Sequence, residues 1–169
     1  DARSPEMQKK LNLKVKFRES FRPFAPTVLL EDVNEWFDLD VESPYMLLVG
    51  KVKEDKLVEQ TSNQKLSKGL EKLNIVRSEI PAVTHVDNSA RIQTVTTENG
   101  IYYDLIKTFK KKTGCPVIVN TSFNIRGEPP VNTPIDAYKC FMATDLDVLV
   151  LGNCILEKHN QINFNLDNE

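Results

Sequence analysis

Apolar positions recur with a helical period in three parts of the chain. Residues 102–109 place apolar side chains at i, i+3, i+4 and i+7, the face of an amphipathic helix, and Gly114 predicts where that helix ends. Residues 133–144 begin with Thr-Pro-Ile-Asp, a capping residue followed by a proline at the first helical position. Residues 4–13 begin with Ser-Pro-Glu, so the same reasoning predicts a shorter helix there.

Shorter apolar or alternating runs predict strands. In residues 91–97 successive side chains alternate between the two faces of a strand. Residues 31–37, between two of the expected strands, have room for one or two helical turns. Gly152 and Asn153 predict the turn of a hairpin near the C-terminus. Helices and strands alternate without repeats, which predicts an α/β (α+β) domain around one mixed sheet. The expected strands are 27–30 and 45–49, both buried, 91–97, 116–120, 148–151 and 154–156.

Two stretches fall outside this pattern. Residues 51–77 are rich in Lys, Glu, Gln, Asn and Ser, so we expect a solvated and partly helical excursion rather than core. Residues 159–169 are rich in Asn, and we expect them to form a frayed tail. The sequence therefore predicts one domain over residues 1–158.

Composition agrees with a folded domain. Of the 169 residues, 40% are hydrophobic and 27% are charged, which excludes a disordered tail and a disulfide scaffold. The longest unbroken apolar run, 45–49, has five residues, whereas a membrane span needs about 20. The first four residues, Asp-Ala-Arg-Ser, include neither an initiator Met nor an apolar leader. We therefore expect an excised part of a longer chain, with function divided between this domain and a missing one.

The cysteines predict no metal site. Cys115, Cys140 and Cys154 form no Cys-x-x-Cys pair, and His85 and His159 add no zinc-like spacing. We expect all three cysteines to be buried, reduced thiols of a cytoplasmic protein.

Charge is unevenly distributed. The chain has 22 Lys and Arg against 24 Asp and Glu, a net charge of −2, yet residues 1–26 hold seven basic and three acidic side chains. A basic corner on a slightly acidic protein suits a small anionic ligand better than a long polyanion such as nucleic acid.

Two tripeptides share a design. Lys-Phe-Arg at 16–18 and Ser-Phe-Asn at 122–124 each place two polar groups around a phenylalanine. In extended chain the outer residues face one side while the phenylalanine points into the core. The first pair then suits phosphate oxygens, and the second suits a small amide-like group. The bland alternatives are a solvated basic stretch for 16–18 and a turn for 122–124.

Three longer blocks carry a resemblance. Residues 14–26, 80–95 and 113–137 closely resemble the C-terminal domain of the O-carbamoyltransferases, which carbamoylate nodulation factors and antibiotics. The resemblance extends to about Lys158, and residues 51–77 match least. It implies a YrdC-like fold, in which helices pack on one face of a twisted mixed sheet and a concave nucleotide pocket lies on the other.

The resemblance also implies a reaction. A domain of this kind uses carbamoyl phosphate and ATP to make carbamoyl-adenylate, with release of phosphate and pyrophosphate. In the family, a kinase-like N-terminal domain of the same polypeptide, carrying a metal site, then transfers the carbamoyl group to a hydroxyl. That domain is absent from this sequence, so complete transfer is not expected of it.

The family signature is KxR followed by SxN, and both halves are present. Lys16 and Arg18 are expected to clamp phosphates, while Ser122 and Asn124 hold the carbamoyl or carbonate-derived group. We expect Mg²⁺ to be held mainly by the nucleotide, with Glu128 as an alternative ligand. The expected supporting residues for substrate and nucleotide are Arg22, His85, Arg91, Thr121 and Arg126.

His85 has several possible roles. It lies in Thr-His-Val-Asp, where it could position a phosphate, act as an acid or base near neutral pH, or be structural. Asp87 is placed to orient it.

Three rival functions share these residues. The first is a threonylcarbamoyl-adenylate synthase for tRNA modification, which uses threonine and bicarbonate. The second is a non-catalytic module that binds a nucleotide or docks double-stranded RNA, which the net charge disfavours. The third is a structural partner with an inactive pocket. The acceptor of the carbamoyl group lies beyond what this sequence specifies.

Overall fold

The computed structural model describes residues 1–161, and these form two compact units. The first unit comprises Asp1–Lys9 and Phe21–Thr121, and the second comprises Lys10–Ser20 and the chain from Ser122 onward. Most of the expected tail, 162–169, lies outside the described residues. No helix among the described residues is both long and apolar enough to cross a membrane.

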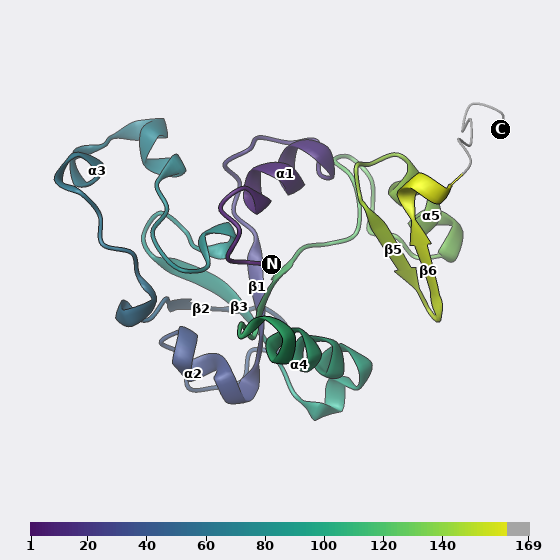
Figure 1. The fold of residues 1–169 in the computed structure, drawn as a ribbon, viewed down its shortest axis with the longest axis horizontal. Coiled ribbons are helices and arrows are strands. Elements are labelled where there is room, and N and C mark those ends of the chain that lie inside the picture. The colour runs from purple at the N-terminus through teal and green to yellow at the C-terminus, as the bar shows by residue number, and fades with distance from the viewer. Residues whose placement is uncertain (162–169) are drawn as a thin grey trace. The chain divides into compact units, whose positions relative to one another are not determined.

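The first unit is built on a four-stranded mixed sheet (Figure 1). The strand order is β2-β3-β1-β4, in which β1 runs parallel to β3 and the other neighbours are antiparallel. The expected α/β class with a mixed sheet is therefore confirmed. The strands are β1 (Ala25–Leu29), β2 (Leu48–Lys51), β3 (Ser89–Val95) and β4 (Val117–Asn120).

Helix α4 (Ile101–Thr113) covers part of one face of this sheet (Figure 1). Its Tyr103 and Ile106 are buried against Leu29 and Val95, the paired last residues of β1 and β3. The helix ends as its sequence predicted, because Gly114 adopts a left-handed φ of 78° that a residue with a side chain rarely adopts.

The remaining helices of the first unit are short. Residues 51–77 are mostly exposed and contain brief helical turns besides the last residue of β2 and two isolated β-bridges. The α-helices are α2 (Val33–Trp36) and α3 (Ser62–Leu66), and α1 (Met7–Lys14) runs from the first unit into the second. Within residues 1–161 the 3-10 helices are Leu30–Asp32, Glu54–Lys56, Gly69–Asn74, Pro81–Val83, Thr97–Asn99 and Lys158–Asn160.

The second unit packs α5 (Pro134–Met142) on a hairpin of β5 (Val148–Leu151) and β6 (Cys154–Glu157) (Figure 1). Phe141 of the helix is fully buried against Leu149 of the hairpin. Both elements were expected, but the hairpin forms a separate two-stranded sheet. The prediction of one mixed sheet for the whole chain is therefore wrong.

Two predictions of burial are also wrong. Tyr45 and Leu47 are 81% and 79% exposed, and the strand begins only at Leu48, because β2 is an edge strand with a neighbour on one side. Cys154 is exposed because it follows the hairpin turn directly, whereas the other two cysteines are buried.

Thr133 is the N-cap of α5, and its contribution to stability can be tested. Thr133 accepts from the backbone N–H of Asp136, and the Asp136 carboxylate accepts from the backbone N–H of Thr133. Thr133→Ala should lower the free energy of unfolding by about 1 kcal/mol in a urea titration. Thr133→Ser keeps the hydroxyl and should remain close to wild type. Equal losses in the two variants would contradict the capping role.

Candidate functional site

Lys16 is a buried lysine placed just beyond the end of α1. Its backbone N–H donates to the carbonyl of Leu11 at 2.9 Å, and only 5% of the residue is exposed. Its ammonium lies against the loop after β4, in the same unit: 2.7 Å from Ser122 O, 2.9 Å from Asn124 O, 2.6 Å from Asn124 Oδ1 and 3.2 Å from Ser122 Oγ. Three of the four expected signature residues therefore meet.

The loop oxygens outnumber the protons of the ammonium. Lys16 has three N–H donors for four oxygen atoms, so at least two oxygens share one proton. The hydroxyl of Ser122 donates to Asn124 Oδ1 at 2.7 Å, and Asn124 Nδ2 donates to the carbonyl of Glu128 at 2.7 Å. We call Lys16, Ser122, Asn124 and the Glu128 carbonyl the ammonium network.

The charge at this position is costly. Burial lowers the pKa of Lys16, the nearby Arg18 guanidinium lowers it further, and Cys140 opposes the shift. The oxygens of the ammonium network offset the loss of water, as a buried charge requires. An anionic ligand beside the ammonium would offset it further.

Arg18 is held by a different partner. Its Nε donates to Asn12 Oδ1 at 2.6 Å, and its backbone N–H donates to Asn12 O at 3.0 Å. Asn12 is fully buried on α1 and donates in turn to the carbonyl of Ser20. Arg18 thus belongs to the same unit as the ammonium network, and these contacts hold it against α1.

The extended geometry expected of residues 16–18 is wrong. Phe17 has a left-handed φ of 47° and is 47% exposed, so it is not anchored in the core. The chain reverses here after α1 ends, and a turn rather than a strand brings Lys16 inward. Phe123 behaves as expected, since it packs against the Phe141 cluster.

The other expected site residues divide between the units. Arg126 belongs to the second unit, where it is exposed and lies 4.0 Å from Glu19. The remaining ones are in the first unit, so the structure describes them separately from the ammonium network: Arg22, Arg91 and Thr121 are exposed, and His85 is half-buried.

The sequence reasoning missed a polar network in the first unit. Gln93 Oε1 accepts from Thr27 Oγ1 at 2.9 Å and from Asn120 Nδ2 at 2.6 Å, while Gln93 Nε2 donates to Pro44 O at 3.0 Å. These contacts fix the end of β4, from which the chain continues into Thr121 and Ser122. The available signal was the polar position at Gln93 in the alternating strand.

His85 lies in a second polar cluster of that unit. Its Nδ1 is 3.0 Å from Ser89 Oγ, which donates to Asp87 Oδ1 at 2.6 Å. Asp87 was expected to orient His85, and its contact to the ring passes through Ser89. Burial lowers the pKa of His85, with an opposing contribution from Asp87 and a smaller lowering by Arg91.

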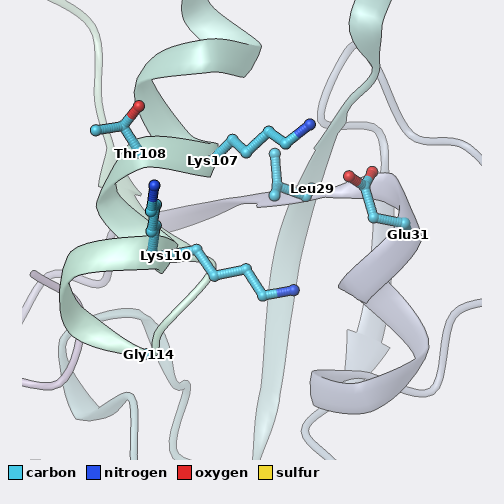
Figure 2. Close-up of a pocket in the computed structure, with 7 residues that line it drawn as sticks. Leu29, Glu31, Lys107, Thr108, Lys110 and Gly114 are labelled. Carbon is cyan, nitrogen blue, oxygen red and sulfur yellow. The ribbon is translucent and has the colours of Figure 1, made fainter.

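The described chain has a pocket of about 510 Å³ elsewhere in the first unit, beside α4 (Figure 2). Leu29, Glu31, Lys107 and Lys110 are among its lining residues. Lys110 is paired with Asp32 at 2.6 Å, and Lys107 stands over the ring of Tyr103. None of the expected site residues lines this pocket.

Metal sites require several ligating side chains around one point. Within residues 1–161 no group of three or more His, Cys, Asp or Glu is placed to hold a metal ion. Glu128, the expected alternative ligand, enters the ammonium network through its backbone carbonyl.

Comparison with known proteins identifies the family. The family model described as carbamoyltransferase C-terminus matches residues 1–158, and the chain belongs to this family. The resemblance read from the three sequence blocks is therefore confirmed.

Named relatives are much longer than this chain. It is 41% identical over 162 residues to the nodulation protein NolNO of Sinorhizobium fredii, covering 94% of the chain and 21% of that protein. It is 34% identical over 140 residues to the 3'-hydroxymethylcephem-O-carbamoyltransferase of Streptomyces clavuligerus, and the match covers 82% of the chain and 23% of that protein. It is 57% identical over 162 residues to the uncharacterized protein sll1178 of Synechocystis, and the match covers 95% of the chain and 26% of that protein. The chain thus spans about a quarter of the length of these relatives.

The ammonium network predicts a local effect of Lys16. Lys16→Met keeps the aliphatic stem and removes all four contacts, so amide hydrogen exchange over residues 122–128 should accelerate and stability should fall by about 1–3 kcal/mol. The matched control is Lys14→Met, because Lys14 is an exposed lysine paired only with Asp145 at 3.3 Å among the ion pairs of residues 1–161. Unchanged exchange at 122–128 in Lys16→Met would refute the network.

The lowered pKa of His85 predicts a pH effect on stability. The folded state favours the neutral ring, so His85 contributes stability that is present above the unfolded pKa of about 6.5 and is lost as pH falls through the folded value. Asp87 has a pKa of about 2 and titrates only later. Urea titrations between pH 7.5 and about 5 should therefore show a smaller loss in His85→Gln than in wild type. Equal losses of stability in the two proteins would contradict a lowered pKa of His85 in the folded state.

Proposed function

We propose that this chain is the adenylate-forming part of an O-carbamoyltransferase. It converts carbamoyl phosphate and ATP into carbamoyl-adenylate, phosphate and pyrophosphate. Membership of the carbamoyltransferase C-terminus family and the relative named as a cephem O-carbamoyltransferase support the carbamoyl chemistry. The observation that carries the proposal is that Lys16 shares its hydrogen bonds with Ser122 and Asn124, 106 and 108 positions away.

The reaction has two steps, and the second step brings two anions together. Water first releases phosphate from carbamoyl phosphate and leaves carbamate. A carbamate oxygen then attacks the α-phosphorus of ATP, the bond to the β-phosphate oxygen breaks, and pyrophosphate leaves with that electron pair. Both partners are anions, so cations must cancel their repulsion and stabilise the charge that develops at phosphorus.

The ammonium network suits this task because it has a surplus acceptor. A carbamate or phosphate oxygen can replace Ser122 Oγ, the most distant of the four oxygens at 3.2 Å, without leaving a Lys16 proton unpaired. The hydroxyl of Ser122 is then able to turn and donate to the ligand. Asn124 stays tied to the Glu128 carbonyl and keeps the loop in shape.

Arg18 supplies a second positive charge near the first. Burial is the main cause of the lowered pKa of Lys16, and the Arg18 guanidinium, two positions along the chain in the same unit, lowers that pKa further. Two adjacent cations are unfavourable by themselves and become favourable when a polyanion binds between them. Arg126 is an exposed third cation of the same unit.

ATP would bring its own magnesium ion. The described residues hold no cluster of three metal-ligating side chains, and Mg²⁺ commonly keeps several waters and binds through substrate phosphates. The ion would neutralise the outgoing pyrophosphate, while this chain's residues hold the carbamoyl end and the α-phosphate.

The second half of the reaction would belong to other parts of a longer protein. The relatives are about four times as long as this chain, which leaves room for a kinase-like domain that passes the carbamoyl group to a hydroxyl and releases AMP. That domain would also recognise the acceptor that carries the hydroxyl.

Pyrophosphate release tests the proposal. The wild-type chain should release pyrophosphate from ATP only when carbamoyl phosphate is present, and Lys16→Met and Ser122→Ala should lower the rate by about 100-fold or more and about 10-fold respectively. Lys14→Met makes the same change of charge outside the network and should keep the wild-type rate.

Two results of the nucleotide assays would overturn it. One is pyrophosphate release that requires threonine and bicarbonate in place of carbamoyl phosphate, which is the activity of a threonylcarbamoyl-adenylate synthase. The other is ATP affinity, measured by isothermal titration, that is the same in wild type and Lys16→Met. Salt-sensitive binding of double-stranded RNA without turnover would likewise count against it.

A further inference from the structure

The loop from His85 to Ser89 is closed by its own hydrogen bonds. The backbone N–H of His85 donates to Ser89 O at 2.8 Å, and Asn88 N–H donates to His85 O at 3.0 Å, with Asn88 at a left-handed φ of 64°. The loop leads directly into β3, so Ser89 is held by the sheet, where it pairs with Lys51. The ring of His85 is thus positioned by a rigid element.

The protons of this cluster can be assigned one at a time. Asp87 Oδ1 lies 2.6 Å from Ser89 Oγ and 3.1 Å from the backbone N of Ser89, while Lys51 lies 3.3 Å from Oδ2. Asp87 is ionised at neutral pH, since its pKa is about 2, and an ionised carboxylate only accepts. The single proton of the Ser89 hydroxyl therefore goes to Asp87, in a short, charge-assisted bond.

Ser89 Oγ consequently has only lone pairs to offer His85. A contact of 3.0 Å between that oxygen and His85 Nδ1 requires the proton to sit on Nδ1. In a neutral ring the other nitrogen, Nε2, then carries a lone pair and no proton. Within residues 1–161 no hydrogen bond to His85 Nε2 is present, and the residue is half-buried rather than enclosed.

We propose that Asp87 and Ser89 are positioning residues that lock His85 as the Nδ1-protonated tautomer, so that its Nε2 accepts a hydrogen bond from an N–H or O–H group of the ligand. A neutral ring locked in this way cannot donate to a phosphate through Nε2, because phosphate oxygens require a donor. The suggested role of His85 as a phosphate ligand is thereby replaced by recognition of a donor group.

This proposal rests on the proposed function for the nature of the ligand. Carbamoyl phosphate and ATP both combine a phosphate with a donor, the carbamoyl NH₂ in one case and the ribose hydroxyls or adenine NH₂ in the other. Arg91 lies on the same face of β3 as Ser89, two positions further on, and influences the pKa of His85. A ligand that combines a donor with an anion fits a neutral imidazole and a guanidinium at the same end of β3.

The charges around His85 favour the neutral ring at physiological pH. Burial and Arg91 lower its pKa, and only Asp87 acts in the opposite direction. Asp87 is itself engaged by Ser89 and Lys51, both of which lower its own pKa. The lock is therefore formed under the conditions in which the reaction would run.

Nitrogen NMR tests the tautomer directly on the unliganded chain. The sequence has two histidines, so long-range ¹H–¹⁵N correlation spectra should contain two imidazole patterns, and His85→Gln identifies which one is His85. We expect the protonated nitrogen of His85 to be Nδ1 at pH 8. His159, whose side chain is 76% exposed and whose Nε2 lies 3.4 Å from Glu157 Oε2, supplies the second pattern. A proton on Nε2 of His85 would overturn the proposal.

Two substitutions separate a lock from a simple change of packing. Ser89→Ala removes the acceptor of Nδ1, so the Nε2-protonated form should appear in a measurable fraction, whereas Ser89→Thr keeps the hydroxyl and should restore the wild-type pattern. Asp87→Asn should give an intermediate result, because an amide oxygen still accepts but without charge. An unchanged tautomer in a folded Ser89→Ala chain would refute the proposal that Ser89 and Asp87 select the tautomer of His85.

Ligand titrations test the role of Nε2. ATP and carbamoyl phosphate are added separately, and at least one should shift the Nε2 resonance; sulfate, an anion without a donor at this pH, should not. An equal response to sulfate would mean that His85 senses an anion only and would overturn donor recognition. Because the unliganded tautomer needs no turnover, a chain that fails the pyrophosphate assay but shows the lock separates failure of the proposed function from failure of this inference.

Discussion

A buried ammonium that must be surrounded by oxygens is the constraint on which the candidate site depends. Lys16 is 5% exposed, and an unpaired charge at such a position would be prohibitively costly. The four compensating oxygens all come from Ser122 and Asn124, more than one hundred residues away. Two of them are backbone carbonyls, which can point at one atom only when the loop is turned back on itself. The same contact thus holds the second unit together and assembles the proposed substrate site.

The two polar clusters use opposite hydrogen-bonding arrangements. Around Lys16 acceptors are in surplus, so one oxygen can be exchanged for a ligand oxygen at little cost. Around His85 every proton is assigned, from Asp87 through Ser89 to Nδ1, so the state of the ring is determined before any ligand arrives. The first arrangement suits a position that must accept different oxygens during a reaction. The second suits a position that must discriminate donors from acceptors.

Rigid elements lead into both clusters. β3 begins at Ser89, and the polar network of Gln93 with Asn120 fixes the last residue of β4 before the chain enters the Ser122 loop. Loops that carry chemistry perform best when their ends are held by a scaffold, because small displacements weaken charge-assisted contacts steeply. Neither cluster depends on the pocket beside α4, where Lys110 is paired with Asp32 and Lys107 lies over the ring of Tyr103.

The sequence by itself determined the helices, most strands, the family and the identity of the signature residues. These are carried by local periodicity, caps such as Thr133 and Gly114, and ordered blocks of residues, all of which can be read within one short window. Tertiary structure alone decided that Phe17 turns outward, that Tyr45 and Leu47 are exposed, and that the hairpin stands as its own sheet. It also decided which oxygens surround Lys16 and which nitrogen of His85 bears the proton. Burial and proton placement depend on atoms brought close from distant positions in the chain, and no short window contains both partners.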